Sequence, residues 1–532
     1  MKLASIDSLE QIVLSSLKPT QKFNSKKEIE DYSKNINSQL KQIGFIQSTH
    51  DSITILNQNK YLSYFSLGAK IDSAKILIDE SLKPYINKSI EKNHITLPFD
   101  KLEETLQEIS NSFEAQGQPF TTVKLENISI SKNTLLAELA IRTSKERRVD
   151  KIIIGGYKNF PRSFLKHYAN LKVGQTFSKD QINNASKALN SLNYATESKE
   201  PEILFTKDST IVYLYLKKQK ANQFDGIIGF SSSNTDKLEF DGYLDLQLNN
   251  AINKGEQLNI QWKSNADDRK QFDTFLSLPF LFSSPITPEV NFNLYKQDST
   301  FLNIKTQIRL KYNINPSHTL AATYFSESSN DLENYSTSLE IINFKSKLFG
   351  SEYSFRQFSE NQIINYKTFI QAQGLFGNKT NTDNNVKLNQ QRYNFKGYYN
   401  WKLNPRNFIF IQNQSGLLLS DELYTNELFR VGGTNTIRGF NEESIFCSSY
   451  IIFNLEYRYQ LNFTSFLYSI TDVGRIENTI ESIKNNLYSF GIGYKYQLNS
   501  GIIDMSYALG KEESTPFNIQ NTKFHIKLTQ FF

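Results

Sequence analysis

The chain has 532 residues, which is long enough for more than one domain. No apolar stretch approaches the roughly 20 residues that a transmembrane helix needs, which excludes helical membrane spans but not a transmembrane barrel, whose strands turn only alternate residues to lipid. The net charge of +6 is small and dispersed, which argues against nucleic-acid binding, and a single cysteine, Cys447, excludes an intramolecular disulfide or a cysteine metal cluster.

The first residues do not read as an export signal. Between Met1 and Leu17 the only apolar run is Ile12-Val13-Leu14, which is shorter than the roughly 7–15 apolar residues of a secretory signal. Because the later parts of the sequence predict export, we expect the sequence to be a mature or re-started form.

A helix-start pattern occurs three times in the first 220 residues. Ser25, Asp100 and Ser178 are each followed three positions later by Glu or Gln, and they lie 75 and 78 residues apart. Ser or Asp at such a position can cap the first turn of a helix, while the acidic or amide side chain reaches back to the capping residue. One such pattern is weak, but three at a near-constant interval predict a repeat.

The residues around each start predict an α+β unit. An apolar stripe of helical period follows each start, and Gly44 and Gly117 are placed to end the first two helices. Strand-like runs follow, such as 202–205 and 210–216, and the Ile-rich run 149–154 precedes the third start. We therefore predict units of the order strand, helix, helix, strand, strand at 1–70, 71–147 and 148–221, the first without a convincing opening strand. Three unrelated α+β units are the alternative.

The second half of the chain predicts a barrel. Aromatic residues are enriched there, and from about residue 224 apolar and polar residues alternate with a period of two, as in 302–312. A soluble β-sandwich would also alternate, but the polar face here repeatedly holds Lys, Arg, Asp and Gln, which suits a wet lumen. We predict sixteen strands, at 224–233, 238–249, 256–264, 270–281, 288–297, 301–313, 317–328, 345–358, 364–376, 391–404, 407–419, 447–461, 464–473, 487–498, 501–510 and 522–532. The run 334–342 is interpreted as a loop, with a seventeenth strand as the alternative.

Three segments together resemble a known family. Ile154-Gly155-Gly156-Tyr157 through Pro161, followed by Val173–Phe177, is similar to the last POTRA domain before the barrel in the outer-membrane assembly factor superfamily, of the BamA/TamA type. The alternating end at Phe532 resembles the β-signal of outer-membrane proteins. The segment Arg430-Val-Gly-Gly-Thr-Asn-Thr-Ile-Arg-Gly-Phe440 resembles the superfamily's signature loop. With three POTRA-like units, the layout resembles TamA more than BamA.

The resemblance implies a fold and a site. The fold is α+β POTRA-like repeats followed by a 16-stranded antiparallel transmembrane β-barrel at 222–532, with a loop near 420–446 that folds into the lumen. The loop motif comprises Gly432, Gly433, Ile437, Arg438, Gly439 and Phe440. A guanidinium in a narrow lumen needs a carboxylate, because an unpaired buried charge is costly; we expect Asp472 first and Glu456 second. An ordinary solvated loop arginine is the alternative.

The resemblance also implies a function without a chemical step. The protein would insert outer-membrane proteins through a seam between the first and last barrel strands, where Gly226, Gly229 and Phe532 lie. Its partners would be outer-membrane lipid, unfolded outer-membrane or secreted clients and a periplasm-spanning protein, with no nucleic acid. We expect the barrel in the bacterial outer membrane and the N-terminal domains in the periplasm.

The alternative function is a two-partner-type secretion pore that exports one dedicated substrate. That family usually has two POTRA domains and an N-terminal plug helix, whereas three units and no plug helix are predicted here. An enzyme is not expected: five scattered histidines offer no metal-ligand spacing, and nucleophile-elbow, phosphate-loop and zinc-protease motifs are missing, so we expect no cofactor and no metal.

Overall fold

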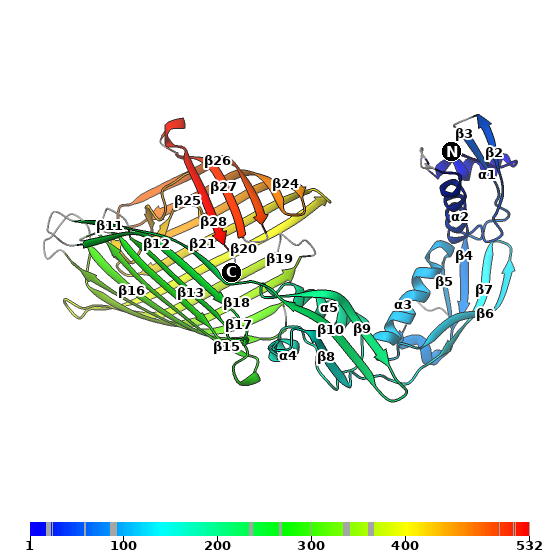
Figure 1. Ribbon diagram of the computed structural model, residues 1–532, viewed down its shortest axis with the longest axis horizontal. Coiled ribbons are helices and arrows are strands. Elements are labelled where there is room, and N and C mark those ends of the chain that lie inside the picture. The colour runs from blue at the N-terminus through cyan, green and yellow to red at the C-terminus, as the bar shows by residue number, and fades with distance from the viewer. Residues whose placement is uncertain are drawn as a thin grey trace. The chain divides into compact units, whose positions relative to one another are not determined.

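The structure is a computed structural model, and its described residues form two compact units (Figure 1). It describes residues 1–17, 23, 25–57, 60–85, 93–232, 238–264, 269–298, 300–315, 317–332, 341–359, 366–498, 501–513, 515–516 and 518–530. The first unit comprises residues 1–150, 173–180 and 205–210, and the second comprises 151–172, 181–204 and 211–532. No helix among the described residues is long and apolar enough to cross a membrane.

The first small sheet has the predicted order of elements. Its elements are β1 (Lys2–Ala4), α1 (Ser8–Ser16), α2 (Lys26–Gln42), β2 (Thr49–Asn57) and β3 (Lys60–Ser66). β3 lies in the middle, parallel to β1 and antiparallel to β2. An opening strand is therefore present, and the expectation that this unit lacks one is wrong. β1 has only three residues, too few to show a period of two.

As predicted, the Ser25 hydroxyl caps α2 by accepting from the Glu28 amide at 3.2 Å, and Gly44 follows the helix with a φ of 112°.

The second small sheet departs from the predicted order. Its elements are β4 (Ser73–Leu77), η1 (Glu80–Tyr85), β5 (His94–Pro98), η2 (Phe99–Lys101), α3 (Leu102–Ala115), β6 (Thr122–Ser131) and β7 (Thr134–Arg142), with the strands in the order β5-β4-β7-β6. Asp100 does not cap α3, because it lies inside the 3-10 turn η2, whose Phe99 carbonyl accepts the Leu102 amide. The helix predicted here is present as α3, but the predicted capping residue of that helix is wrong.

The third small sheet follows the predicted order. It consists of β8 (Lys151–Gly156), α4 (Ser163–His167), α5 (Lys179–Asn190), β9 (Ala195–Phe205) and β10 (Thr210–Lys218). β10 lies between β8 and β9 and runs parallel to β8. α5 begins directly after Ser178, and Val212, Leu214 and Leu216 of β10 are fully buried.

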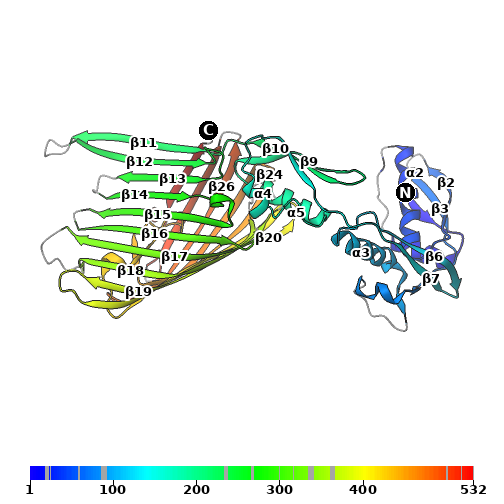
Figure 2. The same ribbon diagram turned by 90° about the horizontal axis from the view of Figure 1, so that it is seen from below.

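Sixteen strands form one antiparallel sheet that curls into a barrel, as predicted (Figures 1 and 2). Its strands, in hydrogen-bonded order, are β11 (Gln223–Ser232), β12 (Leu238–Asn249), β13 (Gln257–Ser264), β14 (Lys270–Ser277), β15 (Ile286–Gln297), β16 (Phe301–Asn313), β17 (His318–Asp331), β18 (Phe344–Phe358), β19 (Tyr366–Asn381), β20 (Lys387–Asn404), β21 (Asn407–Ser420), β24 (Ser449–Asn462), β25 (Ser465–Asn478), β26 (Ile483–Leu498), β27 (Gly501–Glu512) and β28 (Lys523–Gln530). Short 3-10 turns η3 (Leu281–Ser283) and η5 (Ile519–Asn521) lie in the connections. Figure 2 shows β11 to β19 following one another along the wall.

The two faces of the barrel wall differ in chemistry. On β20, Arg392 and Asn400 are buried on the inner face, whereas Tyr399 and Trp401 point outward and are 39% and 54% exposed. On β24, buried Glu456 alternates with exposed outward residues in the same way. A continuous exposed apolar face is unfavourable in water. The inner face is therefore the polar one, and the outer face is suited to lipid.

The third small sheet packs against the barrel within the second unit. The Phe164 ring meets the Phe280 ring edge-on at 4.8 Å, and the His167 ring stacks on Phe280 while its Nε2 lies 2.8 Å from the Ser283 carbonyl oxygen. The Tyr157 hydroxyl donates to Asn253 at 2.6 Å. These contacts fix the position of α4 at one end of the barrel.

Candidate functional site: an inward loop held by buried ion pairs

The segment between β21 and β24 folds into the barrel. It contains η4 (Thr425–Glu427) and a small antiparallel ladder of β22 (Phe429–Val431) with β23 (Ile445–Cys447). Its apolar side chains form one buried cluster with the barrel wall, and Ile437 and Cys447 have no exposed surface. The loop is therefore part of the packed interior, and the predicted Ile437 and Phe440 contribute to that packing.

Arg438 lies between the two carboxylates proposed from the sequence. Its Nε and a terminal nitrogen donate to the two oxygens of Asp472 at 2.9 and 2.6 Å, and its backbone amide donates to the same carboxylate at 3.0 Å. The other terminal nitrogen donates to Glu456 at 2.5 Å. Asp472 is fully buried, and Arg438 and Glu456 are less than 10% exposed. The planar guanidinium suits this bidentate arrangement, so both candidates bind it at once.

Arg458 completes the charge balance of this cluster. It donates to the second oxygen of Glu456 at 2.8 Å and to the Asn400 side chain at 3.1 Å, and its guanidinium lies 4.0 Å from the centre of the Phe410 ring. Two arginines thus face two carboxylates. A buried cluster with matched charges and filled hydrogen bonds avoids the large cost of a lone buried ion.

The motif glycines are required by backbone shape. Gly432, Gly433 and Gly439 have φ values of 121°, 88° and 80°, a region that other residues rarely adopt. A side chain at Gly439 would also strike the backbone of Gly510 on β27. Gly439 therefore allows the loop to approach the barrel wall directly beside Arg438.

A second buried ion pair holds the other end of the loop. The Lys379 ammonium on β19 donates to Glu427 of η4 at 2.5 Å, and both side chains have no exposed surface. The ammonium also donates to the Glu422 carbonyl at 2.7 Å and lies 3.8 Å from the centre of the Tyr424 ring, while Gln390 donates to the other Glu427 oxygen at 2.6 Å. The loop is therefore tied to the wall at two separated places.

Cation–aromatic contacts lie between these two anchors. The Arg430 guanidinium lies 3.3 Å from the centre of the Tyr295 ring, and the Arg392 guanidinium lies 4.5 Å from the centre of the Phe429 ring. Arg392 also pairs with Glu327, which pairs with Lys305. The inner wall thus presents a chain of alternating charges along the loop.

Sequence reasoning found the Arg438 end of the loop and missed the Lys379 end. Lys379 and Glu427 are 48 residues apart and neither lies in a recognisable motif. Lys379 falls just beyond the predicted strand 364–376. It could have been recognised as buried only if the strand had been predicted at its full length, with Lys379 on the inner face. Gly510 was missed too, because a single glycine near a strand end has several ordinary explanations.

The predicted seam residues lie apart from this loop site. Gly226 and Gly229 are on β11, opposite Leu244 and Asp241 of β12, and Phe532 lies outside the described residues. The hydrogen-bonded order begins at β11 and ends at β28, and these two strands contact each other. Over their described residues the structure records no ladder between them. Among the described residues, no group of three His, Cys, Asp or Glu is arranged to hold a metal ion.

Two family models match the chain. Residues 147–218 match the POTRA model, described as a surface antigen variable number repeat, and residues 325–496 match the model of the haemolysin secretion/activation proteins ShlB/FhaC/HecB. In both its POTRA region and its barrel, the chain is therefore similar to proteins of the outer-membrane assembly factor superfamily. The resemblance to this superfamily and the fold that it implies are therefore confirmed. The closer likeness to TamA stays a prediction.

Two solved CdiB structures share the fold of this chain. CdiB from Acinetobacter baumannii aligns with a TM-score of 0.53 and 15% identity over 94% of this chain and 98% of its own. CdiB from Escherichia coli aligns with a TM-score of 0.52 and 13% identity over 96% and 100%. BamA from Haemophilus ducreyi lacking POTRA domains 1–3 aligns with a TM-score of 0.45 and 15% identity over 86% and 98%. No curated protein matches the sequence.

Proposed function

We propose that this protein inserts outer-membrane proteins through a lateral seam between β11 and β28. One observation supports the proposal most: the first and last strands of the sheet contact each other without a ladder over their described residues. Every other neighbouring pair in the sheet is hydrogen-bonded. The seam is therefore the place where the wall opens at least cost, and no chemical step is needed.

An open seam would present two strand edges to a client. The unpaired N–H and C=O groups of an edge strand are a template for a new strand. Gly226 weakens the packing on β11, because a glycine has no side chain to hold against its neighbours. The client's first strand would pair with one edge, and the growing barrel would leave into lipid.

The proposed location follows from the two faces of the barrel. The exposed aromatic and aliphatic outer face would contact outer-membrane lipid, and the three small sheets would lie in the periplasm. Their edge strands could hold clients there by the same strand addition, and they would also be the contact for a periplasm-spanning partner.

A secretion pore for one dedicated substrate is the second candidate. The match to the haemolysin secretion/activation family over 325–496 favours it. A chain that crossed the lumen would have to displace the inward loop, which means breaking both the Arg438 cluster and the Lys379–Glu427 pair. The insertase needs neither step, and we therefore prefer it.

The seam can be tested by disulfide locking. Cys447 is first replaced by Ser, and cysteine pairs are then walked along β11 and β28 in antiparallel order, so that early positions of one strand are combined with late positions of the other. A locked seam is expected to stop the assembly of client barrels until a reductant is added. Matched controls are the cysteine pairs Gln223/Gln247 and Ser506/His525, which join hydrogen-bonded neighbours and leave the seam free.

Quantitative proteomics of the outer membrane and of the medium distinguishes the two candidates. Loss of many barrel proteins in the locked variant supports the insertase. Loss of one secreted protein with barrels intact supports the pore. Normal levels of both with a fully locked seam would exclude the seam mechanism.

A further inference from the structure

The turn between β14 and β15 carries an aromatic side chain that is almost entirely exposed. Phe282 is 94% exposed and Leu281 beside it is exposed as well, whereas Phe280 is buried against Phe164 and His167 of α4. Figure 1 shows this turn beside α4, at the end of the barrel that meets the third small sheet. The turn therefore uses one apolar side chain for a contact within the protein and leaves the next two open.

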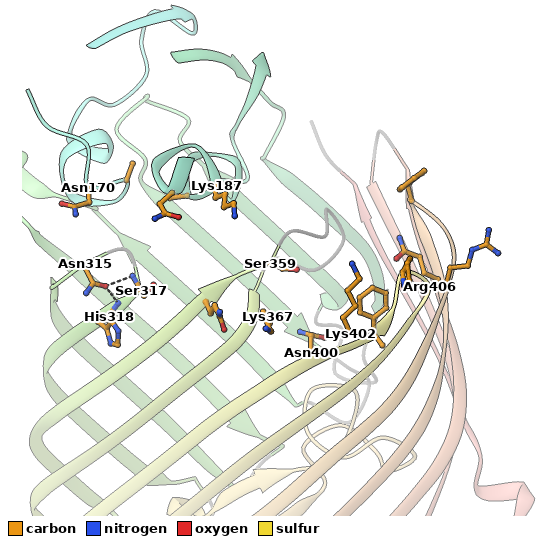
Figure 3. A pocket seen from close by; sticks show the side chains of 18 of the residues that line it. Asn170, Lys187, Asn315, Ser317, His318, Ser359, Lys367, Asn400, Lys402 and Arg406 are labelled. Atoms are coloured by element: carbon orange, nitrogen blue, oxygen red, sulfur yellow. Dashed lines mark hydrogen bonds between the residues drawn. The ribbon is translucent and has the colours of Figure 1, made fainter. Parts of the chain in front are cut away.

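The sequence of this turn holds no charged or amide side chain. From Leu278 to Pro288 it reads Leu-Pro-Phe-Leu-Phe-Ser-Ser-Pro-Ile-Thr-Pro. Another surface at the same end of the barrel is polar: a cavity of 1350 Å³ between α5 and the strand ends is lined mainly by polar side chains, among them Asn170, Lys187 and Lys402 (Figure 3). Connections that meet only water are usually rich in polar residues. The composition of the turn thus indicates a surrounding other than water.

Phe282 is held in an unfavourable backbone conformation. Its φ is 53°, and Phe280 and Ser283 have φ values of 55° and 57°. A bulky residue rarely adopts this left-handed region, whereas glycine adopts it at little cost. The ring contacts with α4 can offset the cost at Phe280, but the exposure of Phe282 leaves it almost no contact within the chain. A phenylalanine at this position is therefore best explained by a contact outside the chain.

The backbone of the turn is suited to an apolar surrounding. The Ser283 amide donates to the Phe280 carbonyl at 2.9 Å, and the Ser284 amide donates to the Leu281 carbonyl at 3.0 Å. The Phe280 amide donates to the Thr287 hydroxyl at 3.3 Å. Such internal pairing is needed wherever water is excluded, because a backbone group without a partner is costly there.

The outer face of the barrel continues into this turn. Ile286 and Val290 are exposed on β15, and Tyr312 of β16, directly opposite Ile286, is exposed as well. Tyrosine is typical of the boundary between lipid headgroups and hydrocarbon. Phe282 precedes Ile286 in the same connection. The exposed residues of the turn are therefore continuous with the apolar face that suits lipid, and we take lipid as their partner.

We propose that Leu281 and Phe282 insert into the periplasmic leaflet of the membrane and anchor this end of the barrel to the lipid surface. The inference rests on the proposed location of the barrel but not on the insertase mechanism. Amphipathic elements of this kind bury their apolar side chains about 5–10 Å into the boundary between headgroups and acyl chains. Because Phe280 of the same turn packs on α4, the anchor also holds the third small sheet at a fixed height above the membrane.

The test places a reporter on the turn in a lipid nanodisc that holds one chain. Phe282→Cys is made in the full chain after Cys447→Ser, labelled with an NBD fluorophore and reconstituted with phosphatidylcholine. Its emission should shift to the blue and should be lost when the lipid carries a nitroxide near the top of its acyl chain. Glu200→Cys, at an exposed position on β9 of the third small sheet, is the control and should keep the emission of a label in water with either lipid.

A second pair of variants tests whether the aromatic side chain causes the insertion. With the label moved to Leu281→Cys, the further change Phe282→Ser should reduce the quenching by at least about twofold, because less apolar surface remains for the lipid. Ile519→Ser removes an exposed apolar side chain from η5, at the other end of the barrel, and should leave the quenching unchanged. Neither serine removes a buried contact, so both proteins should fold.

Three outcomes overturn the proposal. A label at position 282 that stays in water would place the turn outside the membrane, and a blue shift without quenching by the nitroxide lipid would mean that protein covers the turn. Equal quenching with and without the Phe282 ring would show that this side chain does not hold the turn in lipid. If the label inserts but client barrels assemble normally with a locked seam, the anchor stands and the insertase proposal fails. If the label stays in water and the locked seam stops assembly, only the anchor fails.

Discussion

Gly439 of the inward loop lies directly against Gly510 of β27, and neither position has room for a side chain. A Cβ at Gly439 would strike the Gly510 amide, and one at Gly510 would strike the Gly439 carbonyl. β27 is the neighbour of β28, the last strand of the sheet. The tip of the loop that holds Arg438 therefore rests on the wall one strand away from the proposed seam.

The contact between the two glycines predicts a specific effect of one methyl group. Gly510→Ala should push the loop tip from the wall, because backbone atoms cannot move aside as a flexible side chain can. Cys447 is the chain's single cysteine and has no exposed surface, so its rate of maleimide labelling reports the opening of the loop. We expect labelling at least about tenfold faster than in the wild type. Gly374→Ala, where the added methyl meets only ordinary contacts at 3.6 Å, is the control; equal labelling of both variants would contradict the packing described.

Removing Arg438 should leave two carboxylates buried with one arginine. We expect Arg438→Met to cost about 3–5 kcal/mol, because breaking a buried pair strands its partners. The folded band in semi-native electrophoresis should be lost at a lower temperature, and Cys447 should label faster. Arg475→Met changes an exposed arginine on the same strand as Asp472 and should have little effect. A normal melting temperature for Arg438→Met would mean that the cluster does not hold the loop.

The Lys379–Glu427 pair should show strong coupling in a double-mutant cycle. Glu427→Gln leaves the Lys379 ammonium buried without its counter-charge, and we expect a loss of about 3–5 kcal/mol. Lys379→Met is the second single variant of the cycle. Lys379→Met/Glu427→Gln removes both charges and should be more stable than Glu427→Gln alone, because no lone ion remains. Thermal loss of the folded band measures all three. Additive effects would show that the two side chains do not act as a pair.

Acid should loosen the packing of α4 on the barrel through His167. Burial lowers the pKa of His167, although the carbonyl of Ser283 opposes this shift. The folded state therefore prefers the neutral ring, and its stabilising contact is complete above the unfolded pKa near 6.5 and is lost as the pH falls through the lower folded pKa.

Hydrogen exchange can measure this pH effect. After correction for the intrinsic exchange rate, amides of 163–168 should exchange faster at about pH 5 than at about pH 8. His167→Gln keeps a donor for the Ser283 carbonyl without a titration in this range, so its corrected exchange should not change with pH. A pH effect of the same size in both proteins would assign it to another group.

Much of the fold was predictable because the alternation of side chains is local. The strand 301–313 was predicted with the bounds that it has, since apolar and cationic residues alternate along its whole length. β20 was predicted to begin at 391 and begins at Lys387, because Lys387–Gln390 lie beyond the apolar alternation and are strand only by pairing with their neighbours.

The site was predictable only where a motif marked it. The Arg438 cluster was found because its loop and both acidic strands have a recognisable form. The Lys379–Glu427 pair depends on the register of β19 against the loop, which no local pattern records. The prediction that Asp100 caps a helix is wrong. Pro98 is followed by the 3-10 turn η2, which runs directly into α3, whereas α2 begins after a capping serine.

The unequal lengths of the strands have a consequence for the bilayer in which the proposed function places the barrel. Within the residues that the structure describes, β13 and β14 have 8 residues each, whereas β19 and β20 on the other side of the sheet have 16 and 18. At about 3.3 Å per residue and a tilt near 45°, eight residues span only about 19 Å, less than the roughly 30 Å of a typical hydrocarbon core. In the proposed outer-membrane location, lipids beside the short strands would therefore have to compress, while those beside the long strands would not. The bilayer would be thinner on one side of the barrel than on the other, and the thinner side is the one nearer β11.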